Sequence, residues 1–231
     1  AHYALALRHG YKLRAEAEEG AGRDLELHAR ARTLRLYIDE LALATQVSPV
    51  EFRRRHLARN PRALAVLDRV VAMSKFGNAP QGRAHGISLA PYKTSIAAGV
   101  AEISVDRATG VLRVHHFWAA IDPGLVIQPR NLIAQVEGGI NWGLSGLLKE
   151  RITVQAGEVQ QSNFHDYRFL RMSEAPELHV EIVPSNEPPS GAGELGVPMT
   201  GAAVANALFE LTGKRIRHMP FSPDRVLALL A

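Results

Sequence analysis

The spacing of apolar residues predicts helices in the first third of the chain. Ser48 and Pro49 are expected to begin the second helix, because serine caps a helix N-terminus and proline is tolerated at its first position. Asn60 and Pro61 repeat this start signal, and Gly77 is expected to end the third helix. The first helix is predicted from apolar side chains at helical spacing, namely Leu34, Ile38, Leu41 and Ala44.

After about residue 84 the apolar period shortens toward two, which is typical of strands. Residues 101–105 and 111–121 are predicted to form a hairpin around a turn at 106–110, and a second hairpin is expected over 152–159. Residues 178–182 alternate as another strand, and residues 214–217 also look strand-like. Helices are expected over residues 130–148, over about 202–212 and after Ser222-Pro223.

The predicted fold class is α+β, with N-terminal helices followed by a mixed, largely antiparallel sheet packed with helices. Two units are expected: a helical segment over residues 1–77 and an α+β domain over residues 78–231. The helix over 130–148 is unusual, because each helical glycine costs about 1 kcal/mol relative to alanine. Its cluster of small residues therefore predicts close approach of another backbone or of a ligand: Gly138, Gly139, Gly143, Ser145 and Gly146.

Composition and charge exclude several classes of function. The 231 residues are 46% apolar, but no apolar run approaches the roughly 20 residues of a membrane span, so none is expected. The net charge of +4 is mild and no nucleic-acid motif accompanies the basic runs, so no nucleic-acid partner is expected. Because cysteine is absent, this chain can hold no cysteine-ligated iron–sulfur cluster. The first residue is not methionine and no targeting pattern follows. The start is therefore expected to be a place where a longer chain is cut or split, and not a targeting segment.

The ten histidines lack the spacing of a known metal motif. His115 and His116 are adjacent in a predicted strand, where neighbouring side chains point to opposite faces. His165 is expected to help hold its loop and not to bind metal. No metal-ligating residue is therefore predicted, and the absence of a G-x-S-x-G turn gives a serine hydrolase no support.

The loop after the predicted strand 178–182 contains a carboxylate between glycines, Gly191-Ala192-Gly193-Glu194-Leu195-Gly196. Its letters match the dinucleotide-binding pattern, but a proline-rich stretch separates it from the strand and the carboxylate would repel a pyrophosphate. Two interpretations remain. Glu194 is either a solvated loop residue or a side chain presented to a ligand by a backbone that comes close to it.

Four motifs in order resemble one enzyme family. They are Ala134-Gln135-Val136-Glu137-Gly138-Gly139-Ile140, the segment from Gln161 to Tyr167, Ala175-Pro176-Glu177, and the stretch from Ser190 to Phe209. The chain resembles the C-terminal part of the molybdenum-cofactor-binding subunit of the molybdenum hydroxylases, the xanthine dehydrogenase and aldehyde oxidase type. It is nearest to the isoquinoline 1-oxidoreductase branch.

The resemblance implies roles for residues at matching positions. Glu194 would be the catalytic base, and Gln135 would hydrogen-bond the molybdopterin or a molybdenum ligand. Cofactor contacts would also come from glycines of the same two segments: Gly138, Gly139, Gly191 and Gly193. Leu195 stands where proline is common in this branch, and we expect this difference to loosen the turn.

The same resemblance implies an oxidoreductase component that hydroxylates an aldehyde or an aromatic N-heterocycle with water-derived oxygen. Its cofactor would be a molybdopterin-type molybdenum cofactor, in the cytosine dinucleotide form, shared with segments absent here or with a partner chain. Expected partners are the remainder of the molybdenum subunit, an iron–sulfur subunit and a small-molecule substrate. Alone, the chain is expected to be inactive and could form a homo-oligomer. The alternative is a non-catalytic structural fragment or remnant that binds no cofactor.

Overall fold

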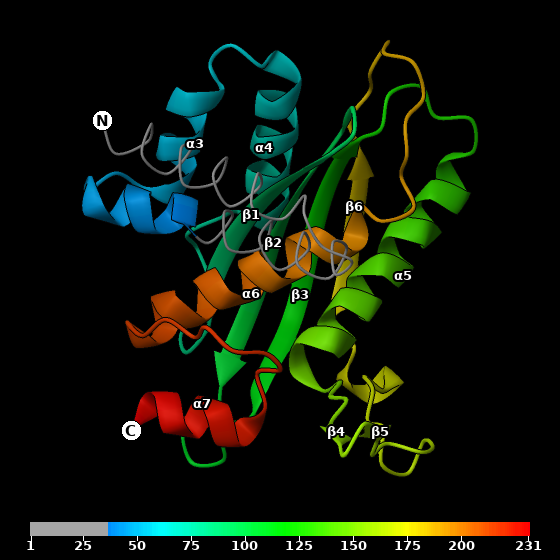
Figure 1. Cartoon of the computed structure of the whole chain (residues 1–231). Helices are drawn as coiled ribbons and strands as arrows, with labels where there is room; N and C mark the ends of the chain where they lie inside the picture. The colour runs from blue at the N-terminus through cyan, green and yellow to red at the C-terminus, as the bar shows by residue number, and fades with distance from the viewer. Residues whose placement is uncertain (1–36) are drawn as a thin grey trace.

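The computed structural model describes residues 37–231, which fold around one four-stranded sheet (Figure 1). The strand order is β1-β2-β3-β6; β1, β2 and β3 pair antiparallel, and β3 pairs parallel with β6. The predicted α+β class with a mixed, largely antiparallel sheet is thus confirmed. The strands are β1 (Ala84–Tyr92), β2 (Ser95–Val105), β3 (Leu112–Asp122) and β6 (Glu177–Ile182).

Helices cover both faces of this sheet (Figure 1). On one face, α4 (Pro61–Ser74) packs with α3 (Pro49–Leu57) beside it, and residues 37–44 form a further helical stretch. On the other face lie α5 (Pro129–Leu148) and α6 (Gly196–Thr212). The remaining short elements are β4 (Val154–Gln155), β5 (Glu158–Val159), η2 (Met172–Glu174) and α7 (Pro223–Leu230).

Capping residues set the helix starts as the sequence predicts. The Ser48 hydroxyl accepts a hydrogen bond from the Glu51 N–H at 3.2 Å, and the Asn60 side chain accepts one from the Ala63 N–H at 3.0 Å. The end of α4 differs slightly. Lys75, with a φ of 48°, takes the left-handed conformation that ends the helix two residues before the predicted Gly77.

Three sequence predictions need correction. Helix α6 begins at Gly196, earlier than the predicted 202, and Pro198 is tolerated in its first turn, where a missing N–H costs no helical hydrogen bond. Residues 214–217 form no strand, because they pair with no strand of either sheet. They follow Gly213, which ends α6 in the left-handed conformation. The hairpin predicted over 152–159 is present only as two paired residues on each side. Leu34, part of the predicted first helix, lies outside the described residues.

The helices before the sheet share a core with it. Val66, Leu67 and Val70 of α4 are fully buried with Ile87 of β1 and Val100 of β2.

The predicted division of the chain at residue 77 stays a prediction. Within residues 37–231, none of the helices combines the length and apolar character needed to cross a membrane.

Candidate functional site

The loop before α6 is tied to the β1–β2 hairpin and to the residue that follows β3. The Ser95 hydroxyl donates to the Gly191 carbonyl at 2.8 Å, and the Ser190 N–H donates to the Pro123 carbonyl at 2.9 Å. A Cβ on Gly191 would lie 3.2 Å from the Tyr92 ring, so glycine lets the loop pack closely against this ring. These contacts hold the segment that carries Glu194 in a defined place at one end of the sheet.

The structure brings together two segments that the sequence singled out. Gln135 of α5 donates a hydrogen bond from Nε2 to the Gly193 carbonyl at 2.9 Å. The two residues are 58 positions apart and both are exposed. One amide hydrogen of Gln135 is used in this contact, and a glutamine amide has a second hydrogen and a carbonyl oxygen available to a ligand.

Glu194 lies next to this contact with an exposed side chain. The Tyr92 phenol donates a hydrogen bond to the Glu194 carboxylate, and this bond is the main cause of a raised Tyr92 pKa. The next residue, Leu195, is fully buried in the core, and its N–H reaches the Ala192 carbonyl at 3.5 Å. The Leu195 side chain therefore joins the turn to the core, and the expectation that leucine in place of proline loosens the turn stays a prediction.

The glycine cluster of α5 has two explanations. A Cβ on Gly139 would lie 3.1 Å from the Gly196 Cα, and one on Gly143 would lie 2.4 Å from the Thr200 hydroxyl oxygen. These glycines therefore allow α5 and α6 to cross closely. In contrast, a Cβ on Gly138 or Gly146 would meet no atom within 4 Å. A cofactor contact for Gly138 or Gly139 stays a prediction, and helix packing alone accounts for Gly139.

One side of α5 near Gly138 also carries an unpaired polar atom. Asn141 follows Gly138 by three residues, which places the two side by side on the helix. Its Oδ1 is buried and makes no hydrogen bond within the part of the chain that the structure describes. An ordered water or a group outside the described residues usually satisfies a buried polar atom of this kind. The open space at Gly138 and the exposed Gln135 lie along the same helix.

Tyr92 and Ser95 are the contacts of this site that sequence reasoning missed. They lie on either side of the β1–β2 turn, and no spacing in the sequence relates them to residues 191–194, almost a hundred positions later. Only the folded sheet brings the hairpin and the loop together.

The hydrogen bond between Tyr92 and Glu194 predicts a measurable titration. We expect the Tyr92 pKa to lie above the ordinary value of about 10 and to fall toward it in Glu194→Gln, because the charged acceptor is lost. Nuclear magnetic resonance of labelled tyrosine rings would measure both proteins. Tyr167, whose pKa is raised by a hydrogen bond to Glu150, should be unchanged and provides an internal control. An identical Tyr92 titration in both proteins would contradict the contact.

The loop of the second family motif is held by an aspartate. Asp166 accepts hydrogen bonds from the Asn163 and Ser162 N–H groups, and these bonds lower its pKa to about 2. His165 is 73% exposed, and its Nε2 lies 3.5 Å from the Asp166 carboxylate. The expectation that His165 holds the loop is thus only partly met, since the loop hydrogen bonds go to Asp166.

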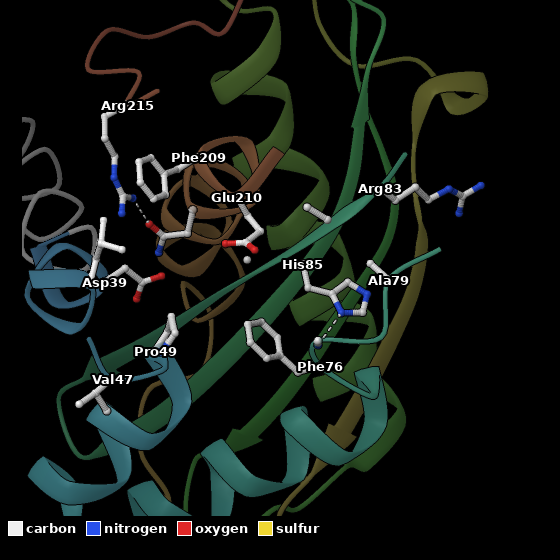
Figure 2. Close-up of a pocket in the computed structure, with 15 residues that line it drawn as sticks. Asp39, Val47, Pro49, Phe76, Ala79, Arg83, His85, Phe209, Glu210 and Arg215 are labelled. Carbon is white, nitrogen blue, oxygen red and sulfur yellow. Dashed lines mark hydrogen bonds between the residues drawn. The ribbon is translucent and has the colours of Figure 1, made fainter. Parts of the chain in front are cut away.

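A cavity of about 330 Å³ lies elsewhere in the molecule, between helical residues 37–44, the start of β1 and the end of α6 (Figure 2). Arg215 lies over the Phe209 ring at 3.7 Å and donates to the Asn206 side chain at 2.8 Å. None of the predicted site residues lines this cavity. The candidate site is instead the open corner of the surface where Gln135, Gly193 and Glu194 are exposed side by side. Tyr92 contacts this corner through its hydrogen bond to Glu194.

Comparisons with known proteins identify the family of this chain. Residues 26–176 match the family model described as the molybdopterin cofactor-binding domain. The chain is 40% identical over 190 residues to the beta subunit of isoquinoline 1-oxidoreductase from Brevundimonas diminuta, covering 80% of this chain and 24% of that one. It is 33% identical over 215 residues to a nicotinate dehydrogenase subunit from Pseudomonas putida, covering 84% of this chain and 18% of that one.

The fold agrees with a solved structure as well. Aldehyde oxidoreductase from Desulfovibrio gigas superimposes with a TM-score of 0.53 and 27% identity, over 59% of this chain and 15% of that protein. The chain thus spans about a quarter or less of the length of the relatives it matches. The family that the sequence motifs indicate is confirmed: this chain belongs to the molybdopterin cofactor-binding domain family of the molybdenum hydroxylases.

Proposed function

We propose that this chain supplies the general base and part of the cofactor-binding surface of a molybdenum hydroxylase. The observation that carries the proposal is the Gln135–Gly193 hydrogen bond, which joins two family motifs and leaves the Glu194 carboxylate exposed beside them. An exposed carboxylate next to an exposed amide offers both a proton acceptor and a hydrogen-bonding group to a bound molecule.

The residues at this corner fit a molybdopterin-type cofactor held against α5. Gln135 would hydrogen-bond it, and Gly138 offers space that no described atom fills. Gly191 and Gly193 would let the loop backbone come close to the cofactor. We infer the cytosine dinucleotide form, with the remaining contacts supplied by protein segments outside this chain.

Glu194 would act on the proton of the attacking water-derived oxygen. The bound cofactor would supply the two-electron oxidation and make the attacking water more acidic. Glu194 accepts the proton as general base, and Tyr92 fixes the orientation of the carboxylate through its hydrogen bond. The substrate would be an aldehyde or an aromatic N-heterocycle, as the names of the relatives suggest.

The exposed apolar side chains of this chain support the proposal that other protein chains bind it. A contiguous apolar patch of more than a few hundred Å² is typical of an interaction surface, and we infer that some of the large exposed apolar side chains of this chain belong to such a patch. We propose that the remainder of the molybdenum subunit covers part of this surface and that an iron–sulfur subunit takes the electrons, because this chain contains no cysteine. In isolation, the chain would self-associate through the same groups. The most exposed of them are Ile127, Trp142, Phe164 and Met172.

The origin of the product oxygen tests the proposed reaction. The complete assembly should be supplied with an aldehyde or an N-heterocycle in water enriched in heavy oxygen, with an artificial electron acceptor. We expect the labelled oxygen to appear in the hydroxylated product by mass spectrometry. Lack of turnover on both substrate classes by an assembly with full molybdenum content would instead favour the alternative of a non-catalytic structural part.

A further inference from the structure

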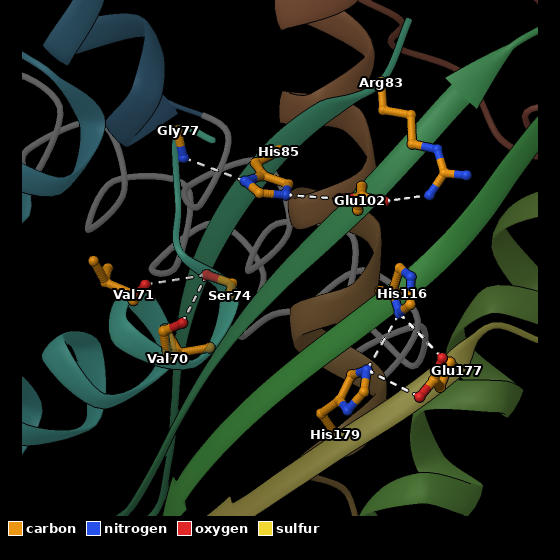
Figure 3. Close-up of polar contacts among 10 residues, drawn as sticks. All are labelled: Val70, Val71, Ser74, Gly77, Arg83, His85, Glu102, His116, Glu177 and His179. Carbon is orange, nitrogen blue, oxygen red and sulfur yellow. Dashed lines mark hydrogen bonds and ion pairs between the residues drawn. The ribbon is translucent and has the colours of Figure 1, made fainter. Parts of the chain in front are cut away.

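Three ligand-type side chains meet at the β3–β6 edge of the sheet (Figure 3). His116 extends from β3, and Glu177 and His179 extend from β6. The His116 Nδ1 lies 3.2 Å from the His179 Nε2 and 3.5 Å from a Glu177 carboxylate oxygen, and the second oxygen lies 3.8 Å from the His179 Nε2. Two imidazole nitrogens and one carboxylate therefore converge on a small volume.

The strand register explains why these side chains converge. In the parallel β3–β6 pair, His116 is opposite Glu177 and Trp118 is opposite His179. Alternate residues of a strand share one face, so all four side chains lie on the face covered by α4. The Trp118 ring stacks on His116 at 5.2 Å and on His179 at 5.4 Å between centroids. This stacking restricts both imidazole rings before any ligand arrives.

We propose that His116, Glu177 and His179 form a binding site for one zinc ion. Zinc binds imidazole nitrogen at about 2.0–2.1 Å in tetrahedral geometry, which separates two nitrogen ligands by roughly 3.3–3.4 Å. The observed 3.2 Å between the two nitrogens is close to this value. The 3.5 and 3.8 Å distances belong to different oxygens of Glu177, so the carboxylate must turn to bring one oxygen close to both nitrogens, and its side chain is 67% exposed, which leaves it room to do so.

The surroundings of the cluster decide which group can serve as the fourth ligand. The nearest carboxylate in register, Glu102, has both oxygens occupied, by Arg83 at 2.6 Å and His85 at 3.1 Å. It is therefore not available as a ligand. The side chains of His116 and His179 are about one-third exposed, so an ion can enter from solvent and a water can complete the tetrahedron. Two histidines and one carboxylate with an open position form a common zinc ligand set.

Isothermal titration calorimetry with zinc chloride would test the site in the metal-free chain. We expect one zinc per chain and at least about tenfold weaker binding in His179→Gln, because even outer contacts of a metal site commonly contribute 10- to 100-fold. Zinc at about 100 times its dissociation constant should also raise the melting temperature by about 5–10 °C. Glu177→Gln, whose side chain is largely exposed, should weaken zinc binding without disturbing the fold.

The matched control is His165→Gln, which removes a histidine that is 73% exposed and lies outside the cluster. Its zinc affinity should equal that of the unsubstituted chain. The competing explanation is a hydrogen bond between two neutral imidazoles, in which one donates to the other. Absence of zinc binding, or binding that survives both His179→Gln and Glu177→Gln unchanged, would overturn the proposal and leave this hydrogen bond as the role of the cluster.

Discussion

Replacing Glu194 with glutamine should lower turnover by at least about 100-fold in the complete assembly, while molybdenum content stays near normal. The substitution keeps the size and hydrogen-bonding capacity of the side chain but removes its ability to take a proton. General acid–base groups typically contribute 100- to 10,000-fold to the rate, which sets this expectation. Steady-state turnover per bound molybdenum is the quantity to measure, so that cofactor loss and rate loss are separated.

Two comparison variants make this result specific. Glu187→Gln removes an exposed carboxylate from the same loop and should leave turnover unchanged. Gln135→Ala should lower molybdenum content more than the rate per bound molybdenum, because it removes the hydrogen bond to Gly193 and a proposed cofactor contact. Near-normal turnover of Glu194→Gln at full occupancy would show that Glu194 is a solvated loop residue.

Adding a methyl group at Gly196 should destabilise the fold by about 1–3 kcal/mol or more. A Cβ at this position would lie 2.5 Å from the Val136 carbonyl oxygen and 2.7 Å from the Ile140 nitrogen, both backbone atoms of α5. Backbone atoms cannot rotate away, so α5 and α6 would have to separate at their crossing. Denaturant unfolding of Gly196→Ala and the unsubstituted chain would measure the difference.

Gly146→Ala is the matched control for this substitution. Gly146 also lies on α5, but a Cβ there would meet no atom within 4 Å. Alanine is favoured over glycine in a helix by about 1 kcal/mol, so this variant should be more stable than the unsubstituted chain. The same chemical change is thus expected to have opposite signs at two glycines. Equal effects at both positions would contradict the close helix crossing.

The elements with strong local signals could be predicted from the sequence. Ser48 and Asn60 begin helices as expected, because their side chains cap the first turn without help from the rest of the fold. The start of α6 could not be placed in the same way. Its first residues, from Gly196, become helical through packing against α5, a tertiary contact that no local pattern contains.

The contacts of the candidate site likewise depend on tertiary structure that the sequence does not reveal. Glu194 and Gln135 were identified by resemblance to a family, and the Gln135–Gly193 bond now relates them in space. Tyr92 could not be assigned, because its contact with Glu194 depends on where the β1–β2 hairpin meets a later loop. The histidine cluster could not be predicted either. Its ligands come from two strands whose parallel pairing brings His116 beside Glu177 and His179.

Metal analysis of this chain, purified alone and as part of the complete assembly, is the most direct test of the claim that it holds only part of a molybdopterin site. The complete assembly should contain close to one molybdenum per copy of this chain. The chain alone should contain far less than one, because Gln135, Gly138 and the loop from Gly191 to Glu194 form one open corner and not an enclosed site. Close to one molybdenum per isolated chain would contradict the account.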